Sequence, residues 1–246
     1  MLSVFVLYVY TSSNSLKISF MFQSITHAMQ QCKYCEAECV KKGFQKNGNQ
    51  KLRCVRCKRY QLAHYTNRAW LNNVNETIST LVKESCGIRS IGRILKISPA
   101  TVIKRIKIIA ASIGKPVISL GKKYELDEMR TFVRKKTNTY WIAYAIEKGT
   151  KSIIDFKVGR RTLKTLGSVV DTLKLAKAER IYTDSLNLYH SLIRKEIHCK
   201  RRFTINHIER MNLTLRTHLK RLNRRTICYS RNALMLEACL KIYFWS

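Results

Sequence analysis

The chain has 246 residues, and its 47 lysines and arginines against 15 acidic residues give a formal net charge of +32. An excess of this size opposes compaction by self-repulsion, so we expect a polyanionic partner, with nucleic acid first and a membrane surface second. The nine cysteines are odd in number and five lie outside paired motifs, which excludes a secreted disulfide framework and favours a reducing cytoplasm.

The first 28 residues do not read as part of a folded domain. Leu2–Tyr10 is apolar, but it lacks a basic flank and a clear cleavage site, and it is shorter than the roughly 20 residues that a membrane helix needs. No transmembrane segment is predicted elsewhere in the chain. We therefore expect residues 1–28 to be dispensable, or to be translated from upstream of a truer start at Met29.

Residues 29–70 contain two Cys-x-x-Cys pairs that are separated by 18 residues. Each pair can form a tight knuckle with both sulfurs on one side, and two knuckles supply the four ligands of a tetrahedral zinc site. The four predicted ligands are Cys32, Cys35, Cys54 and Cys57. Cys39 could replace one of them, but it has no paired partner and is interpreted as a spare thiol. The many basic residues around this predicted zinc-ribbon module favour contact with a DNA backbone.

Residues 71–115 carry apolar side chains at helical spacing, interrupted before Ser98-Pro99. Serine is a good N-cap and proline a good first helical residue, so a second helix is predicted to begin there. This pattern predicts a helix-turn-helix whose second helix enters the DNA major groove. Its outward side chains are predicted to include Thr101, Lys104 and Arg105. A plain helical hairpin is the alternative. Residues 116–123 are expected to be a linker.

Residues 124–246 are predicted to form an α/β domain. Three strands at 124–133, 140–146 and 152–158 are followed by a helix at 162–175 and a fourth strand at 180–183. A helix at 185–195, a short strand at 197–203 and a long basic helix at 207–222 complete the expected elements. This order of three strands, helix, strand and helix is typical of a ribonuclease H-like fold.

The predicted fold brings three acids together. Asp127 lies within the first strand, Asp184 closes the fourth strand, and Glu209 lies in the first turn of the long helix. Because the first and fourth strands are neighbours in this fold, the carboxylates should converge and bind Mg²⁺ or Mn²⁺. Two such ions activate a hydroxyl nucleophile and stabilise the leaving oxygen of a phosphodiester. The alternative for Asp184 alone is an N-cap of the next helix.

Other polar residues of this domain compete for a role. Glu125 shares a strand face with Asp127 and is a candidate supporting group, whereas Glu128 points to the opposite face and is interpreted as structural. His207 and Asn212 flank Glu209, and for them a capping or surface role is at least as plausible as an assisting one.

The last part of the domain is strongly basic. Residues 194–231 hold 12 basic and 2 acidic side chains, a pattern that predicts a track for DNA phosphates rather than a merely solvated surface. Ile208, Leu215, Leu219 and Leu222 are expected to face the core. The residues predicted to contact DNA are Arg210, Arg216, Lys220 and Arg224.

Over residues 29–246 the chain resembles the DDE-type transposases of the insertion-sequence-one family. The resemblance is carried by the four paired cysteines, by Leu126-Asp127-Glu128 and Tyr182-Thr183-Asp184, and above all by the run from His207 to Arg216. The segment 221–230 extends it. The resemblance implies a zinc finger and helix-turn-helix that bind terminal inverted repeats, and a catalytic triad of Asp127, Asp184 and Glu209.

The resemblance also implies cleavage of DNA strand ends, joining of the free 3′-hydroxyls to target DNA, assembly into a homo-oligomer on two transposon ends, and a nucleoid-associated bacterial protein. The two hypotheses are therefore a metal-dependent DNA transposase and, as the alternative, a DNA-binding regulator whose nuclease-like domain is inactive. The presence of all three acids favours the enzyme.

Overall fold

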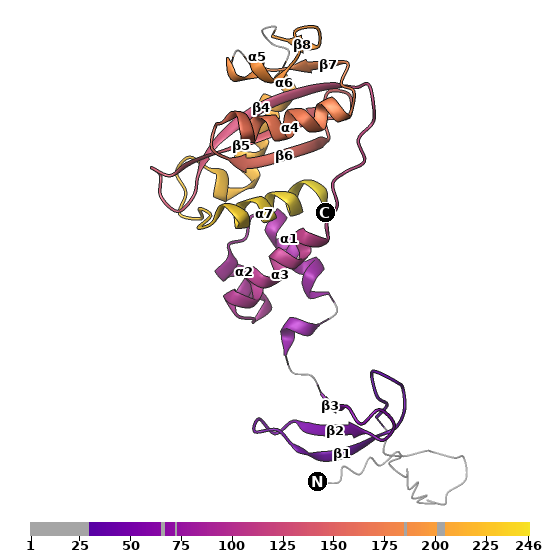
Figure 1. Cartoon of the computed structure of the whole chain (residues 1–246). Helices are drawn as coiled ribbons and strands as arrows, with labels where there is room; N and C mark the ends of the chain where they lie inside the picture. The colour runs from indigo at the N-terminus through magenta and orange to yellow at the C-terminus, as the bar shows by residue number, and fades with distance from the viewer. Residues whose placement is uncertain (1–29, 65–66, 72, 185, 201–204) are drawn as a thin grey trace, which may run out of the picture. The chain divides into compact units, whose positions relative to one another are not determined.

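The computed structural model describes residues 30–64, 67–71, 73–184, 186–200 and 205–246 (Figure 1). The chain divides into two compact units, residues 1–66 and 67–246. The proposed extension at 1–28 lies outside the described residues, as do residues 201–203 of the strand expected at 197–203. In the described part of the chain no helix is long and apolar enough to cross a membrane.

The first unit contains a small antiparallel sheet in the order β1-β2-β3. Its strands are β1 (Cys39–Phe44), β2 (Gln50–Cys54) and β3 (Tyr60–Leu62). Only a small group of buried side chains holds this sheet together, chiefly Leu52 with the cysteines. A sheet with so little apolar core depends on another source of stability.

The second unit begins with three helices that follow the short turn η1 (Arg68–Trp70). They are α1 (Val74–Lys83), α2 (Ile88–Leu95) and α3 (Pro99–Ser112). The predicted cap is confirmed, because the Ser98 hydroxyl accepts a hydrogen bond from the Thr101 backbone N–H at 3.1 Å. Gly92 lets α2 pack closely on the turn before α3, since a Cβ there would lie 2.9 Å from the Ile97 carbonyl oxygen.

A five-stranded mixed sheet follows, in the order β6-β5-β4-β7-β8. Its strands are β4 (Lys123–Phe132), β5 (Thr139–Glu147), β6 (Ile153–Gly159), β7 (Arg180–Tyr182) and β8 (His198–Cys199). β4, β5 and β6 form an antiparallel meander, whereas β7 pairs in parallel with β4 and β8 pairs in parallel with β7. The predicted meander and the predicted neighbourhood of the first and fourth strands are confirmed.

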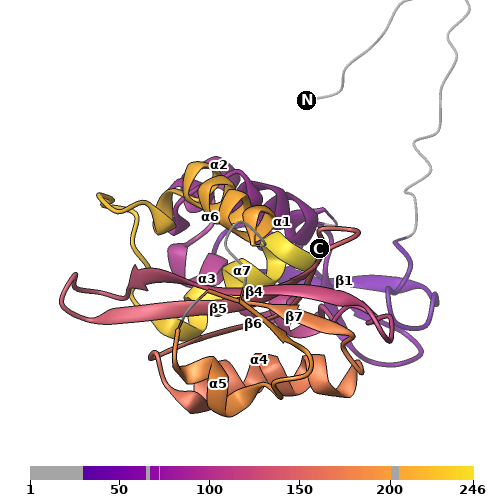
Figure 2. The same ribbon diagram turned by 90° about the horizontal axis from the view of Figure 1, so that it is seen from above.

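Helices cover both faces of this sheet (Figure 2). One face carries α4 (Leu163–Leu175) and α5 (Leu188–Leu192), and the other carries α6 (Asn206–His218), the short turn η2 (Lys220–Leu222) and α7 (Ala233–Trp245). Alternate residues of β4 divide between the two cores: Tyr124 and Leu126 pack toward α4, and Met129 packs toward α6.

The C-terminal helix α7 belongs to two cores at once. Leu236 and Leu240 are buried against the sheet, whereas Cys239 and Ile242 are buried among α1, α2 and α3. A helix that is apolar on all sides is stable only when it is buried on all sides. The helices of 74–112 and the sheet domain therefore form one compact unit rather than two parts separated by a free linker.

Residues 116–123, expected to be a linker, are attached to the sheet domain. Lys115 forms an ion pair with the buried Asp155 at 2.9 Å, and the Ser119 carbonyl accepts a hydrogen bond from the Tyr124 hydroxyl at 2.9 Å. The backbone N–H of Gly121 donates to the Ala176 carbonyl at 3.0 Å. The division of residues 71–246 into a DNA-reading part and a catalytic part stays a prediction about function.

Candidate active site and cysteine cluster

The four predicted zinc ligands come together in the first unit. The sulfurs of Cys32, Cys35, Cys54 and Cys57 all lie within 4.8 Å of one another. The Cys32–Cys57 and Cys35–Cys54 sulfur distances are 3.6 and 3.4 Å. Sulfurs around a tetrahedral zinc ion, each about 2.3 Å from the metal, are separated by about 3.8 Å. The donor set therefore fits a zinc ion that all four sulfurs hold.

Two matching turns position these sulfurs. The residue after each second cysteine has a left-handed backbone, with φ of 58° at Glu36 and 60° at Lys58. In the second turn the Cys57 backbone N–H donates to the Cys54 sulfur at 3.3 Å. Burial opposes ionisation of Cys54, but this N–H and the neighbouring thiol of Cys35 outweigh it and lower the pKa of Cys54 to about 6.

Cys39 does not join the cluster. It is buried beside it on β1, and its burial, together with Cys32 and Cys54, raises the pKa of its thiol to about 11. Its sulfur is not among the four that lie within 4.8 Å of one another. The structure thus supports the interpretation of Cys39 as a spare thiol.

Two of the three predicted catalytic acids meet on neighbouring interior strands of the large sheet. In the parallel pair β4–β7, Glu125 lies opposite Tyr182, so two residues further on Asp127 and Asp184 extend from neighbouring positions. One carboxylate oxygen each from Asp127, Glu128 and Asp184 lies within 4.8 Å of the others. This separation is close to the ~4.2 Å that two oxygen ligands of one Mg²⁺ can span.

Both oxygens of Asp127 are held. Its Oδ1 accepts a hydrogen bond from the Glu128 backbone N–H at 2.7 Å, and its Oδ2 accepts one from the Asn212 amide at 2.7 Å. The Tyr144 hydroxyl lies 3.0 Å from the Asn212 Oδ1 and 3.1 Å from the Ile208 carbonyl oxygen. The Asn212 amide and the Tyr144 hydroxyl therefore fix the carboxylate from the side of α6.

Burial raises the pKa of Asp127 to about 6, and the neighbouring charges of Glu128 and Asp184 add to the rise. The two hydrogen bonds to its oxygens act in the opposite direction but do not cancel it. A carboxylate that is costly to ionise among other carboxylates gains free energy from a bound cation. The carboxylates around Asp127 could therefore bind a divalent cation.

The N-cap position of α5 is Asn187, so Asp184 does not cap that helix as its alternative role required. The Asp184 Oδ1 accepts a hydrogen bond from the Leu186 backbone N–H at 3.0 Å, which turns the chain toward α5. This bond does not prevent Asp184 from binding a cation, because a carboxylate has two oxygens and several lone-pair directions.

Glu125 places the N-terminus of α6 against β4. It is fully buried, and its two oxygens accept hydrogen bonds from the Ile208 backbone N–H at 3.0 Å and bind His207 Nδ1 at 2.7 Å. Lys148 forms an ion pair with it at 3.7 Å. A carboxylate in the first turn of a helix satisfies N–H groups and favours the helix dipole. Glu125 is therefore the supporting group that the sequence suggested.

Glu209 does not join the cluster of three carboxylates, and it is exposed on α6. It lies between His207, which is bonded to Glu125, and Asn212, which is bonded to Asp127. Glu209, Asn212 and Arg216 share a flank at i, i+3 and i+7 spacing. α6 thus runs alongside Asp127, which Asn212 contacts, whereas the Glu209 side chain is exposed to solvent.

Glu128 stands closer to the two aspartates than the sequence predicted. It is buried on the α4 side of the sheet, where it forms an ion pair with Arg161 at 2.9 Å and accepts a hydrogen bond from the Tyr189 hydroxyl. The alternation of strand side chains predicted its face correctly but not the approach of its oxygen to Asp127. The contacts of Glu128 with Arg161 and Tyr189 are typical of an acid that has a structural role.

Several predicted DNA contacts have other partners. Arg105 was expected to face outward, but its guanidinium donates to the Ala69 carbonyl at 2.6 Å and lies over the Trp70 ring. Arg216 donates to the Leu222 and Arg130 carbonyls, each at 3.1 Å. Long side chains turn inward where backbone carbonyls remain to be bonded. The residues that do face solvent are Lys104, Arg210, Lys220 and Arg224, while Thr101 is half-buried.

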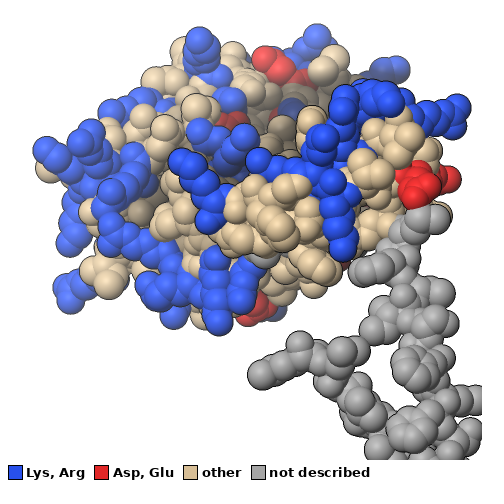
Figure 3. Space-filling model, turned by 90° about the horizontal axis from the view of Figure 1, so that it is seen from below, with Lys and Arg blue, Asp and Glu red and all other residues tan. Residues whose placement is uncertain are grey.

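On the face drawn in Figure 3, lysines and arginines spread across the surface and acidic side chains form only isolated spots. With the charge of +32 this describes a surface suited to a polyanion.

Residues 122–244 match the family of IS1 transposase. The insertion element iso-IS1n protein InsB of Shigella dysenteriae is 35% identical over 113 residues, which cover 46% of this chain and 86% of that protein. The insertion element IS1 4 protein InsB of Escherichia coli is 31% identical over 148 residues, covering 60% of this chain and 84% of that protein.

These matches define the chain as a transposase by family. In particular, it belongs to the IS1 transposase family, as its sequence motifs predicted. Among solved structures, a simian T-cell lymphotropic virus intasome in complex with a PP2A regulatory subunit is similar at 13% identity with a TM-score of 0.32, over 58% of this chain and 59% of that one.

Proposed function

We propose that this protein is a DNA transposase that cuts the ends of an insertion sequence and joins the free 3′-hydroxyls to target DNA. Family membership supports the class of reaction. The observation that carries the site is the approach of Asp127, in the middle of β4, to Asp184, just past the end of the parallel strand β7, with one carboxylate oxygen of each within 4.8 Å.

In this proposal Asp127, Asp184 and Glu209 hold Mg²⁺ or Mn²⁺ on a ribonuclease H-like domain. When bound, the ions activate the attacking hydroxyl and stabilise the leaving oxygen of the phosphodiester. Asn212 and the Glu128 backbone N–H keep Asp127 oriented, since they bind its two oxygens. Glu125 keeps α6, and with it Glu209, beside β4.

The remaining parts are proposed to bind DNA. The four clustered cysteines hold a zinc ion in a ribbon module, and α2 and α3 act as a helix-turn-helix in which Lys104 faces the DNA. The zinc-ribbon module and the helix-turn-helix would both bind the terminal inverted repeats. The protein would assemble as a homo-oligomer on the two transposon ends. Thr101 and Arg105 act in this scheme by fixing the recognition helix.

The test is a strand-transfer assay with magnesium, using a duplex that carries the repeat flanking the gene. We expect Asp184→Asn to bind this duplex with unchanged affinity and to lose strand transfer. Joining by Asp184→Asn at the wild-type rate would refute the assignment. Failure of the wild-type protein to join ends that it binds specifically would favour the DNA-binding regulator instead.

The same assay decides the third acid. We expect Glu209→Gln to lose strand transfer as Asp184→Asn does. The matched variant Glu128→Gln removes a carboxylate that already binds Arg161 and Tyr189, so its main effect should be on stability. If Glu128→Gln were stable but inactive and Glu209→Gln remained active, the third acid of the triad would be Glu128 and not Glu209.

A further inference from the structure

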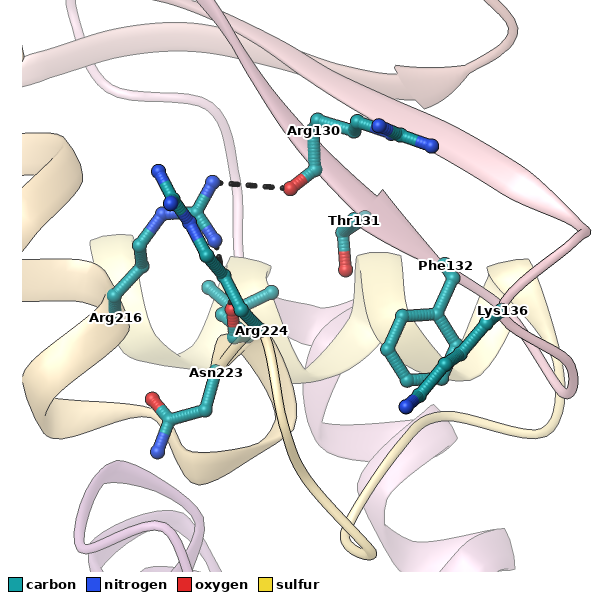
Figure 4. Close-up of a pocket in the computed structure, with 8 residues that line it drawn as sticks. Arg130, Thr131, Phe132, Lys136, Arg216, Asn223 and Arg224 are labelled. Carbon is teal, nitrogen blue, oxygen red and sulfur yellow. Dashed lines mark hydrogen bonds between the residues drawn. The ribbon is translucent and has the colours of Figure 1, made fainter.

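A basic pocket of about 510 Å³ opens beside the C-terminal end of β4 (Figure 4). Three of its side chains are cationic and point toward it, and none of the residues that line it is acidic. The lining residues are Arg130, Thr131, Phe132, Lys136, Arg216, Leu222, Asn223 and Arg224.

Arg216 is fixed in the wall of this pocket. Its two terminal nitrogens donate to the Leu222 and Arg130 carbonyls at 3.1 Å, so the guanidinium plane is held before any ligand binds. A guanidinium has five N–H groups, and these two bonds use only part of them. A planar donor that is already oriented loses little freedom when it binds an anion.

Arg224 brings a second guanidinium to the same place. Figure 4 shows the Arg224 side chain beside that of Arg216. Burial lowers the pKa of Arg216, and the nearby charge of Arg224 lowers it further. Two cations this close, with no acid among the lining residues, are stabilised by an anion that bridges them.

The other polar groups suit the same ligand. Lys136 lies at the opposite side of the pocket, and the Thr131 hydroxyl points into it (Figure 4). Asn223 lines the pocket, but its amide turns away from Thr131 and Lys136. The Arg130 side chain turns away and contributes its backbone carbonyl to Arg216. Guanidinium, ammonium and hydroxyl donors together match the oxygens of a phosphate group.

The pocket lies in line with the acids. Residues 127 and 131 of β4 point to the same face of the sheet, and four residues of a strand span about 13 Å. On α6, which runs in the same direction as β4, Arg216 follows Glu209 by two turns, or about 10 Å. Successive nucleotides of one strand advance about 3.4 Å along the DNA axis, so the pocket is roughly four nucleotides from Asp127.

We infer that this pocket binds a backbone phosphate of the substrate DNA strand. This phosphate lies about four nucleotides from the phosphodiester of the same strand that is positioned at Asp127. This inference rests on the proposed function, because it takes that strand as the substrate. The contact sets the register of the strand over Asp127 and carries no base specificity. Arg216 forms the fixed wall of the pocket, and Lys136 and Arg224 contact the phosphate from the solvent side.

The test measures DNA binding by the full chain, with the duplex that carries the flanking repeat. Lys136 and Arg224 are exposed, so the double variant Lys136→Gln/Arg224→Gln should keep the fold. We expect it to bind about tenfold more weakly, as the loss of a charge-assisted contact predicts. The slope of log affinity against log salt should fall by about one. The control Lys164→Gln, an exposed site on α4 across the sheet, should change neither.

A second arm locates the phosphate. Single neutral methylphosphonate linkages are placed along each strand of the duplex, and binding is measured for the wild type and the double variant. We expect one position, near four nucleotides from the cleaved end, to weaken the wild type and to have no further effect in the variant. Equal losses in both proteins at every position would overturn the inference, as would a Lys164→Gln loss as large as that of the double variant.

This readout is separate from catalysis. If the proposed reaction were wrong, the wild type would bind without strand transfer, and the methylphosphonate pattern would still report the pocket. If only the pocket were wrong, strand transfer would persist and the pattern would be absent. The single variant Arg224→Gln, which leaves Lys136 in place, repeats the comparison should the double variant have a lowered melting temperature.

Discussion

Replacing Asp127 by asparagine should stabilise the protein while abolishing strand transfer. The ionised carboxylate is unfavourable where it stands, because burial and the charges of Glu128 and Asp184 raise the pKa of Asp127 from 3.8 to about 6. A group whose pKa is raised in the folded state supports stability at low pH and loses that contribution as pH rises through about 4 to 6. At pH 7.5 the loss is about 3 kcal/mol, and at pH 4.5 about 1 kcal/mol.

The hydrogen bonds around residue 127 can adapt to the amide. Asparagine can still accept from the Glu128 backbone N–H, and its new NH₂ group would then meet Asn212. If the Asn212 amide turns over, its oxygen accepts from residue 127 and its NH₂ donates to the Tyr144 oxygen. The Tyr144 hydroxyl can then donate to the Ile208 carbonyl, 3.1 Å away. No buried donor is left without a partner, so the electrostatic gain should persist.

The assay is denaturant unfolding of the wild type and Asp127→Asn in buffer without magnesium or manganese. We expect the variant to be more stable by up to about 3 kcal/mol at pH 7.5, with the difference shrinking toward about 1 kcal/mol at pH 4.5. Added magnesium should stabilise the wild type and leave the variant unchanged. A variant that is no more stable than the wild type at pH 7.5, or a difference independent of pH, would refute this reasoning.

Two further changes test the residues that would form or support the two proposed metal sites. Cys54→Ser should lose the roughly one zinc per chain expected from the cysteine cluster, measured by metal analysis, and should unfold the small unit, because its apolar core is too small to replace the metal. Zinc retained at full occupancy would contradict the four-sulfur site. Glu125→Ala should destabilise the sheet domain by about 3 kcal/mol in denaturant unfolding, because it leaves the buried Ile208 N–H unpaired and opens a cavity. It should also reduce strand transfer more than DNA binding, since α6 carries Glu209; an unchanged unfolding midpoint would contradict this.

The sequence predicted the backbone of the sheet domain well. The three meander strands begin and end within one residue of their predicted bounds, because alternating apolar residues and turn signals mark them directly. The parallel pairing of β4 with β7 followed from the order of elements, and that pairing brings Asp127 to Asp184. The buried side of the predicted long helix was also predicted, since Ile208, Leu215, Leu219 and Leu222 are all buried.

The directions in which long polar side chains point could not be predicted from the sequence pattern. Arg105 and Arg216 both occupy positions that face outward on a helical wheel, yet both reach carbonyls of other segments. Which carbonyls remain unpaired depends on where loops such as 67–71 end, and no local pattern encodes that. Glu128 is the same kind of case: its face followed from strand alternation, but its approach to Asp127 depends on the twist of β4 and on Tyr189 across the core.

The helix α7 explains why the expected linker did not separate two domains. Its sequence is apolar on nearly every side, so it has no single face that predicts a partner, and only the fold shows that it needs two. Leu240 completes the core of the sheet, and Ile242 completes the core of α1, α2 and α3. Rotating the three helices away from the sheet would expose one side of α7 to water. Burial of that side, at about 25 cal/mol per Å², therefore opposes such a movement. Under the proposed function, a DNA end held by α3 would therefore keep a fixed relation to Asp127 on β4, and recognition would be coupled to cleavage by shared packing rather than by a hinge.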